Sequence, residues 1–155
     1  MAEKNLLARD IMTRDVITVC PEDDVEKAAR LLLEHHVSGL PVVDDAGKLV
    51  GIVSEADLVL QEKGVRGPLY TVFMGGVLYL ENPRRFDEEF RRAIARKIGD
   101  LMSKKVHTVA PDDPMTKVAA IMADKGVNRV PVVDREQRLV GIVSRQDIIR
   151  ASYGN

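Results

Sequence analysis

The chain has 155 residues, a mass of 17.2 kDa and a net charge of -1, which is enough for one domain with a substantial core. The near-neutral charge gives no general attraction to nucleic acid or anionic lipid. The single cysteine, Cys20, excludes an intramolecular disulfide and a zinc site built from several cysteines. The first ten residues carry charges and no long apolar run, so we expect no signal peptide. These features predict a cytoplasmic protein that does not bind membranes.

One segment of the chain occurs twice. Residues 10–59 return as residues 100–149 without a gap, and roughly four in ten positions are identical. A copy of this size is too small to bury a full core alone, so we expect the two copies to share one core in a single compact, pseudo-twofold domain. The predicted organisation is a first repeat (10–59), an insert (60–99) and a second repeat (100–150).

Each repeat opens with a short β-branched run, at 16–19 or 106–109, which ends near a proline and predicts a brief strand. Acidic residues then precede apolar residues at helical spacing, which predicts a helix that buries one face. The apolar residues of these two helices are Val25, Ala29, Leu32 and Leu33, and Met115, Ala119 and Met122. Gly126 is a suitable helix stop in the second repeat, whereas His36 holds that place in the first.

Two apolar strands follow each of these helices. They read LPVVDD and LVGIVS in the first repeat and VPVVDR and LVGIVS in the second, and a short polar turn between them predicts a hairpin. The hairpins lead into helices that begin at Ser54 and Ser144. Because apolar residues scarcely alternate along these strands, we expect both faces to be buried. The predicted fold class is α+β (α/β-like), with two β-α-β-β-α units and helices on one face of the sheet.

The insert holds five of the chain's six Tyr and Phe residues. Its apolar stretch PLYTVFMGGVLYL is too short to cross a membrane and predicts a packed loop or a hairpin. Asn82 and Pro83 predict the start of a helix that packs on another element. The apolar stripe of that helix consists of Phe86, Phe90, Ile94 and Ile98. The insert is therefore either a contact surface for a partner or a cover for the chain's own core.

The sharpest chemical signal is the duplicated segment GIVSEADL and GIVSRQDI. Ser54 and Ser144 each begin a helix, and Asp57 and Asp147 follow three positions later. The simplest interpretation is a capping box, in which serine and aspartate bind free backbone N–H groups. Alternatively, the helix N-terminus binds an anion and the carboxylate accepts both hydroxyls of a ribose. Duplication after the same strand favours a nucleotide site.

At these residues the chain resembles the cystathionine-β-synthase (CBS) domain family, whose units occur in tandem pairs called Bateman modules. The resemblance covers both repeats through DIMT or DLMS, HHVSGLPVVD or KGVNRVPVVD, and GIVSxxD. It implies that adenine nucleotides or related adenosyl ligands bind in clefts between the units. It also implies a homodimer, with four units in a flat disc.

By position, the resemblance assigns ribose binding to Asp57 and Asp147, and the accompanying hydroxyls to Ser54 and Ser144. The other ligand-binding residues that it implies are Thr13 and Ser103 in the opening motif, Val16, Ile17, Val106 and His107 along the base-binding edge, and Val37, Ser38, Gly39, Val127, Asn128 and Arg129 before the PVVD strand.

The resemblance pairs the front half of one repeat with the S-x-x-D segment of the other. The first expected cleft combines Thr13, Val37 and Ser38 with Ser144 and Asp147. The second expected cleft combines Ser103, Asn128 and Arg129 with Ser54 and Asp57.

The two clefts are expected to differ in their affinity for phosphate. Arg129 stands where related proteins place a phosphate-contacting base, whereas the first repeat has Gly39 there. A guanidinium makes a bidentate phosphate contact that glycine cannot replace. We therefore expect nucleotide phosphates to prefer the cleft that contains Arg129, unless Arg129 is only a solvated surface residue.

The sequence thus favours a regulatory module that senses AMP, ADP, ATP or a related adenosyl ligand such as S-adenosylmethionine. It would signal through an unidentified protein partner or its own oligomerisation. We expect no enzymatic activity, catalytic cofactor or metal site, and we interpret His35 and His36 as helix-end residues. The alternative is a structural protein-interaction module in which the serines and aspartates only cap helices. Nucleic-acid binding through the basic run at 91–97 is disfavoured, because the acids Asp87, Glu88 and Glu89 lie beside it on the same predicted helix and favour a solvated helix face.

Overall fold

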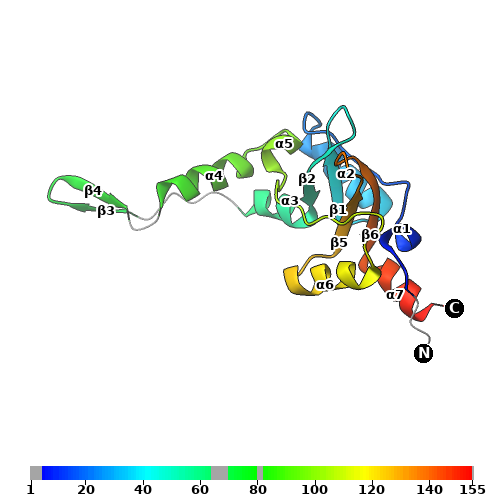
Figure 1. Cartoon of the computed structure of the whole chain (residues 1–155). Coiled ribbons are helices and arrows are strands. Elements are labelled where there is room, and N and C mark those ends of the chain that lie inside the picture. Colours follow the sequence, from blue (N-terminus) through cyan, green and yellow to red (C-terminus); the bar gives the residue numbers. More distant parts are fainter. Residues whose placement is uncertain (1–4, 64–69, 80–81, 155) are drawn as a thin grey trace. The chain divides into compact units, whose positions relative to one another are not determined.

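The structure is a computed structural model and describes residues 5–63, 70–79 and 82–154 (Figure 1). None of the helices in these ranges has the length and apolarity needed to cross a bilayer. In chain order the elements are α1 (Ala8–Ile11), α2 (Val25–His35), β1 (Gly39–Val43), β2 (Leu49–Ser54), α3 (Glu55–Glu62), β3 (Tyr70–Phe73), β4 (Gly76–Tyr79), α4 (Pro83–Ala93), α5 (Ile98–Leu101), α6 (Met115–Lys125), β5 (Arg129–Val133), β6 (Leu139–Ser144) and α7 (Arg145–Tyr153).

Each repeat forms a helix, a two-stranded sheet and a second helix, as predicted. The predicted first strands are reduced to one parallel bridge each, at Val19 and at Val109. In the first repeat the Val19 N–H donates to the carbonyl of Pro41 and its carbonyl accepts from Val43. The next bond of this ladder would need an N–H on Pro41, and proline has none. Pro131 ends the second ladder for the same reason.

Both hairpin turns are held by an aspartate at the end of the first strand. Asp44 accepts hydrogen bonds of 2.9 Å from the N–H groups of Ala46 and Lys48, and Asp134 does the same in the second repeat. Such bonds stabilise a turn because they replace the ladder bonds that the chain gives up there. The turns contain one left-handed residue each, Gly47 and Gln137, at equivalent positions.

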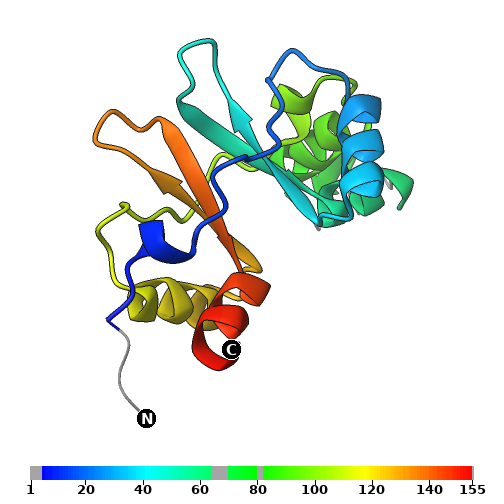
Figure 2. The same cartoon turned by 90° about the vertical axis from the view of Figure 1, so that its right-hand side faces the viewer.

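The two hairpins are joined at their turns by reciprocal bonds. The Leu49 N–H donates to the carbonyl of Gln137, and the Leu139 N–H donates to the carbonyl of Gly47, both at 3.0 Å. The two bonds join equivalent residues, because Leu139 and Gln137 lie ninety positions after Leu49 and Gly47. Figure 2 shows the β1–β2 and β5–β6 hairpins side by side. This reciprocity is what an internal pseudo-twofold axis produces.

Burial confirms the prediction for one strand of each hairpin and corrects it for the other. β1 and β5 are buried along almost their whole length. β2 and β6 instead alternate between buried and half-buried residues, with Val53 and Val143 completely buried. The prediction was wrong for β2 and β6, because Ile52 and Ile142, on the face opposite Val53 and Val143, are only half-buried.

The helices bury a narrower stripe than predicted. In α2 the buried residues are Val25, Ala28 and Leu32, whereas Leu33, which was assigned to the core, is 77% exposed. A spacing of three and four residues keeps one helical face, and Leu33 lies about 100° around the axis from Leu32. The predicted helix stops are confirmed, since His36 and Gly126 both adopt the left-handed conformation after their helices.

Contacts divide the chain into two compact units. The second-repeat unit comprises Met1–Cys20, Pro41–Ile52 and Ser103–Asn155, and the insert unit comprises Pro21–Leu40 and Val53–Met102. The core of the second-repeat unit contains Ala8, Val109, Val118, Met122, Val130, Val132 and Val143. Within the insert unit, the most deeply buried side chains are those of Ala28, Leu40, Val53, Ile98 and Leu101.

The insert forms the predicted hairpin and helix. β3 and β4 pair in antiparallel register around a left-handed Gly75, and the Asn82 side chain caps α4 by accepting from the Arg84 N–H at 3.0 Å. The predicted apolar stripe does not persist as one packed face. α4 ends at Ala93, Phe90 and Ile94 are exposed, and Ile98 is buried as part of the separate helix α5. The side chain of Phe86 lies outside the described part of the chain.

Candidate functional site

The opening motif of each repeat docks on the strand that leads into the S-x-x-D segment of the other. Thr13 and Ile142 exchange two backbone hydrogen bonds of 2.9 and 3.0 Å, and Ser103 and Ile52 exchange two bonds of 2.9 Å. Ile142 and Ile52 each lie two residues before the serine of the motif. The backbone of Thr13 is therefore held on β6, two residues before Ser144, the N-cap of α7.

Close packing under this junction depends on a glycine. A Cβ added to Gly141 would lie 2.4 Å from the Sδ of Met12, the residue before Thr13. No carbon atom fits at that distance without moving the methionine. Gly141 thus lets the opening motif approach β6 closely enough for the Thr13 bonds to form, and Met12 packs against the core of the second-repeat unit.

The segments before the PVVD strands lie against the helix starts of their own repeats. Arg129 is the cross-strand partner of Ser144, and the Arg145 N–H donates to the carbonyl of Asn128 at 3.1 Å. In the insert unit the Glu55 N–H likewise donates to the carbonyl of Ser38 at 3.0 Å. An antiparallel hairpin returns the last residue of its second strand to the first residue of its first strand, which explains why Arg129 lies opposite Ser144. The expected pairing of Asn128 and Arg129 with Ser54 and Asp57 in one cleft stays a prediction.

The second S-x-x-D segment forms a complete capping box at the start of α7. Asp147 Oδ2 accepts from the N–H of Ser144 at 2.8 Å and from its hydroxyl at 3.0 Å. The Ser144 Oγ accepts in turn from the Asp147 N–H at 3.3 Å. Asp147 is only 9% exposed. Its other oxygen, Oδ1, takes no part in the cap and lies 3.4 Å from Nη1 of the exposed Arg150.

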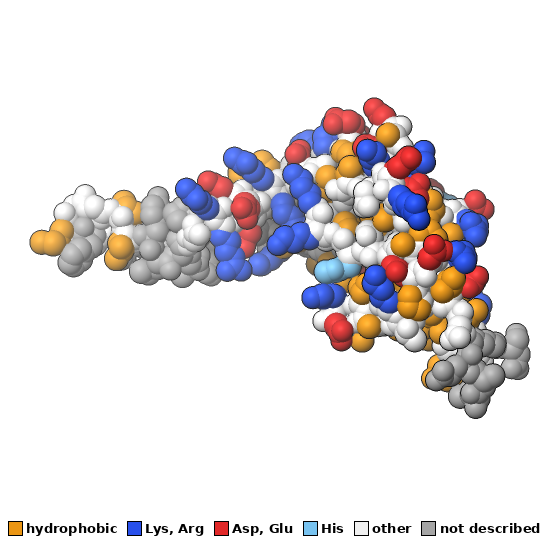
Figure 3. Space-filling view, viewed as in Figure 1, with side chains coloured by type: hydrophobic (Ala, Val, Ile, Leu, Met, Phe, Trp, Pro, Cys, Tyr) orange, Lys and Arg blue, Asp and Glu red, His pale blue; other side chains and the backbone are white. Residues whose placement is uncertain are grey.

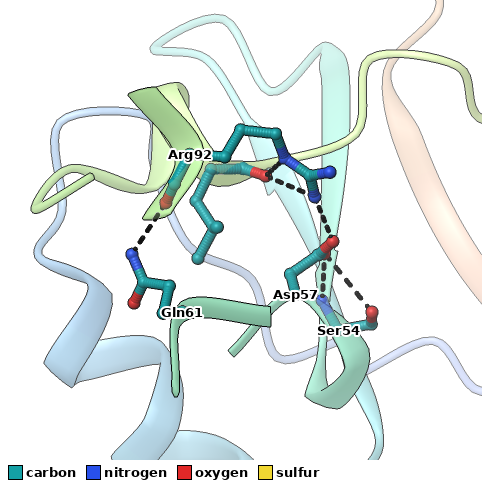
Figure 4. Close-up of polar contacts among 5 residues, drawn as sticks. Ser54, Asp57, Gln61 and Arg92 are labelled. Atoms are coloured by element: carbon teal, nitrogen blue, oxygen red, sulfur yellow. Dashed lines mark hydrogen bonds and ion pairs between the residues drawn. The ribbon is translucent and has the colours of Figure 1, made fainter. Parts of the chain in front are cut away.

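The first S-x-x-D segment repeats this arrangement at the start of α3. Asp57 Oδ2 accepts from the N–H of Ser54 at 2.9 Å and from its hydroxyl at 3.3 Å (Figure 4). Oδ1 of Asp57 accepts a hydrogen bond of 2.5 Å from Nη2 of Arg92 in α4. The capping interpretation is therefore confirmed in both repeats. Each cap uses one carboxylate oxygen and leaves the other for a second partner.

Sequence reasoning missed Arg92. It belongs to the basic run at 91–97, which we had interpreted as a solvated face. Most of that interpretation fits α4, where Arg85 forms an exposed ion pair with Glu89 and acidic side chains lie among the basic ones (Figure 3). No local spacing distinguishes Arg92 from its neighbours, because its partner Asp57 lies 35 positions away.

The remaining predicted ligand residues differ in exposure. Val16, Ile17, Val106, Val37 and Val127 are half-buried, Gly39 is buried, and Thr13, Ser103 and His107 are exposed. A half-buried apolar edge beside exposed hydroxyls is compatible with a base and a sugar, but a packed core edge has the same pattern.

A surface hollow of about 420 Å³ lies elsewhere on the second-repeat unit. Its lining residues are Thr108, Val109, Ala110, Pro111, Asp112, Asp113, Val133, Asp134, Arg135 and Gln137. None of the predicted ligand residues is among them. Within the described residues no group of three His, Cys, Asp or Glu side chains could hold a metal ion.

The carboxylates in this hollow have structural partners. The backbone N–H of Ala110, helped by Lys117, holds the pKa of Asp113 below its ordinary value. The backbone N–H groups of Arg138 and Glu136, with the Arg138 side chain, lower the pKa of Asp134 in the same way. Hydrogen bonds to the charged form explain both directions. These aspartates hold turns, and the hollow gives no sign of a ligand chemistry of its own.

Comparison with known proteins agrees with this geometry. The family model for the CBS domain matches residues 8–63 and 98–154, which is more than half of the chain. The protein belongs to the CBS-domain family, and its two repeats are tandem CBS domains. Uncharacterized protein MJ1426 of Methanocaldococcus jannaschii is 33% identical over 153 residues, which cover 94% of this chain and 90% of that protein. The chain also matches parts of longer enzymes, of whose length it spans 23–25%.

Two solved structures of CBS pairs resemble the chain along nearly all of its length. CBSX2 of Arabidopsis thaliana in complex with AMP has a TM-score of 0.74 and 28% identity, covering 94% of this chain and 95% of that one. The CBS domain pair of protein MJ0100, in complex with 5'-methylthioadenosine and S-adenosyl-L-methionine, has a TM-score of 0.71 and 28% identity, covering 97% and 98%. These matches confirm the predicted fold class.

Proposed function

We propose that this CBS pair is a regulatory module that binds an adenosine-containing ligand through the carboxylate of Asp147. The arrangement of Asp147 carries the proposal. This nearly buried carboxylate is fixed through one oxygen by the cap of α7, and its second oxygen lies 3.4 Å from an exposed arginine, its one partner among the described side chains. A carboxylate oriented in this way accepts the vicinal hydroxyls of a ribose without first breaking its own cap.

Other groups of the second-repeat unit supply complementary functions. The Thr13 side chain is exposed and its backbone is bonded to β6, two residues before Ser144. Arg129 lies opposite Ser144 across the hairpin, and a guanidinium binds a 5'-phosphate strongly. We assign Asp147 and Ser144 to the ribose, Arg129 to the phosphate, and Val16 and Ile17 to the base-binding edge.

The ligand class is supported by the relatives. CBSX2 binds AMP, and the MJ0100 pair binds two adenosyl compounds. We therefore propose AMP, ADP, ATP or S-adenosylmethionine as ligand of this chain. The ligand would act as a signal rather than a substrate, with an unidentified protein partner or a homodimer as the output. The insert unit offers a second candidate site at Ser38, Gly39, Ser54 and Asp57. Ser103, Val106 and His107 remain predicted ligand residues of the second-repeat unit.

Titration of the purified chain tests the proposal. Thermal unfolding and calorimetry would be run with AMP, ADP, ATP and S-adenosylmethionine, and with GMP as the comparison for base selectivity. A ligand at a hundred times its Kd stabilises the folded state by about 2.7 kcal/mol, so binding should raise the Tm clearly. If no adenosyl compound raises the Tm or releases heat, the proposal is wrong.

The second candidate function is a structural protein-interaction module without a small ligand. It is favoured by the caps themselves, which account for Ser54, Asp57, Ser144 and Asp147 without a ligand. It is also favoured by the β3–β4 hairpin, where Val72, Met74, Val77 and Leu78 are exposed. The side chains of Tyr70, Phe73 and Tyr79 in this hairpin lie outside the described part of the chain. The titration above separates the two functions.

A further inference from the structure

Arg92 binds Oδ1 of Asp57, the carboxylate oxygen that the cap of α3 does not use. Its Nη2 donates to Asp57 Oδ1 at 2.5 Å, and the pair is sheltered, with side-chain exposures of 37% and 13%. A short hydrogen bond between two charged groups with limited access to water is far stronger than an ion pair on an open surface. A sugar hydroxyl that approached Asp57 would meet an acceptor already in use.

The guanidinium is held from a second side. Nε and Nη2 of Arg92 both donate to the carbonyl of Leu101, at 3.4 and 3.3 Å, and Leu101 is completely buried in α5 (Figure 4). The planar group is therefore oriented by a fixed backbone atom as well as by Asp57. An arginine ordered in this way loses little additional freedom when it binds the carboxylate.

The backbone around Arg92 is hydrogen-bonded to α3, the helix whose first turn contains Asp57. The amide of Gln61, at the end of α3, donates to the carbonyl of Arg92 at 3.1 Å and to the carbonyl of Ala95 at 2.8 Å. These two carbonyls belong to the last turn of α4 and the residues just after it, where helix carbonyls need outside donors. The α3 helix thus supports both members of the Arg92–Asp57 pair.

The equivalent carboxylate in the second repeat has a much weaker partner. Arg150 comes from the same helix as Asp147, lies 3.4 Å from its Oδ1 and is 71% exposed. A contact of that length to an exposed arginine contributes little and is easily exchanged for another donor. The two repeats therefore present the same cap with unequal access to the second oxygen.

We propose that Arg92 is a specificity-determining residue that competes with ribose hydroxyls for Asp57 and thereby makes the two nucleoside sites unequal. The inference rests on the proposed function. A nucleoside binds first at Asp147, and it binds at Asp57 only when Arg92 leaves. Apparent affinity falls in proportion to the fraction of protein in the open state, so a pair that is closed about ninety to ninety-nine times in a hundred weakens the Asp57 site by about tenfold to a hundredfold.

Calorimetric titration of the full chain with AMP and with adenosine tests this competition. The wild-type chain should show one tight site per chain and a second site about tenfold to a hundredfold weaker. Arg92→Met keeps the length of the side chain and removes its charge, so it should bring the second site close to the first. Arg92→Lys keeps a charge but loses the planar contact to Leu101 and should give an intermediate value. Thermal unfolding would establish that each variant is folded.

Two further variants make the result specific. Arg85→Met removes an exposed arginine of the same helix, one that pairs with Glu89, and should leave both sites as in the wild type. Asp57→Asn added to Arg92→Met should remove the second site that Arg92→Met had strengthened. Two equal sites in the wild type, or a second site unchanged by Arg92→Met, would overturn the inference and leave the proposed function standing. No binding to either protein would overturn the proposed function and the inference together.

Discussion

The two S-x-x-D turns share the same cap and differ in the arginine that contacts the aspartate oxygen outside the cap. Both use a serine N–H and hydroxyl to hold one aspartate oxygen, within 0.3 Å of the same distances. At Asp57 the insert supplies an arginine from a different helix, whereas at Asp147 the only arginine partner comes from one turn along the same helix among the described contacts. Both copies have the same cap, and the insert between them gives the Asp57 carboxylate a partner from a different helix.

The largest expected effect comes from the two carboxylates themselves. Asp147→Asn should weaken AMP binding at the tight site by about a hundredfold, because two hydrogen bonds to a charged acceptor become weaker neutral ones. Asp57→Asn should change the affinity of that tight site for AMP by less than threefold. This corresponds to about 0.6 kcal/mol or less, since a tenfold change is about 1.4 kcal/mol. Calorimetry on both variants measures the difference. Equal losses of AMP affinity in the two variants would show that the two carboxylates contribute equally and would contradict the expected difference between them.

A smaller effect is expected at the phosphate position. Arg129→Met should weaken AMP binding by about tenfold and leave adenosine binding unchanged, because a single charge-assisted contact to the phosphate is lost. Arg135→Met, an exposed arginine at the turn of the same hairpin, is the matched comparison and should bind AMP like the wild type. An equal loss for AMP and adenosine after Arg129→Met would mean that Arg129 supports the fold rather than the phosphate.

The smallest effect concerns stability, at the helix stops where the repeats differ. His36 and Gly126 have the same left-handed backbone, with φ of 53° and 65°. Gly126→His should lower the free energy of unfolding by about 1 kcal/mol, because a side chain is strained there. His36→Gly should raise it by about half as much, since glycine also gains freedom in the unfolded chain. Urea unfolding compares the two variants, and a change of the same sign in both would contradict this account.

Most of the fold could be predicted because the information is local or duplicated. The helix that starts at Asn82, the hairpins and the capping serines depend on neighbours within a few positions, and two copies of each pattern support the same assignment. The failures are instructive. Residues 16–18 have strand propensity, but Pro41 lacks the N–H that would extend the ladder, and only the parallel register reveals that conflict. Leu33 is apolar and helical, yet it faces away from the core.

In the candidate site, the helix caps could be predicted from the sequence. Ser144 and Asp147 form the arrangement that their spacing suggests. The position of Arg129 in its motif, by contrast, does not specify which helix start its side chain accompanies, although its backbone lies opposite Ser144. Arg92 could not be found from the sequence at all, since its role depends on a tertiary contact across 35 residues.

The exchange of opening segments between the repeats has a consequence for how such a chain can be cut and recombined. The backbone of Thr13 is hydrogen-bonded to β6 of the second repeat, and the backbone of Ser103 is hydrogen-bonded to β2 of the first. A polypeptide carrying a single repeat would therefore bury this edge only by borrowing the opening segment of a sister molecule. The two repeats of this chain thus resemble the two subunits of a domain-swapped dimer that are joined in one polypeptide. We therefore expect a fragment with a single repeat to self-associate rather than fold as a monomer.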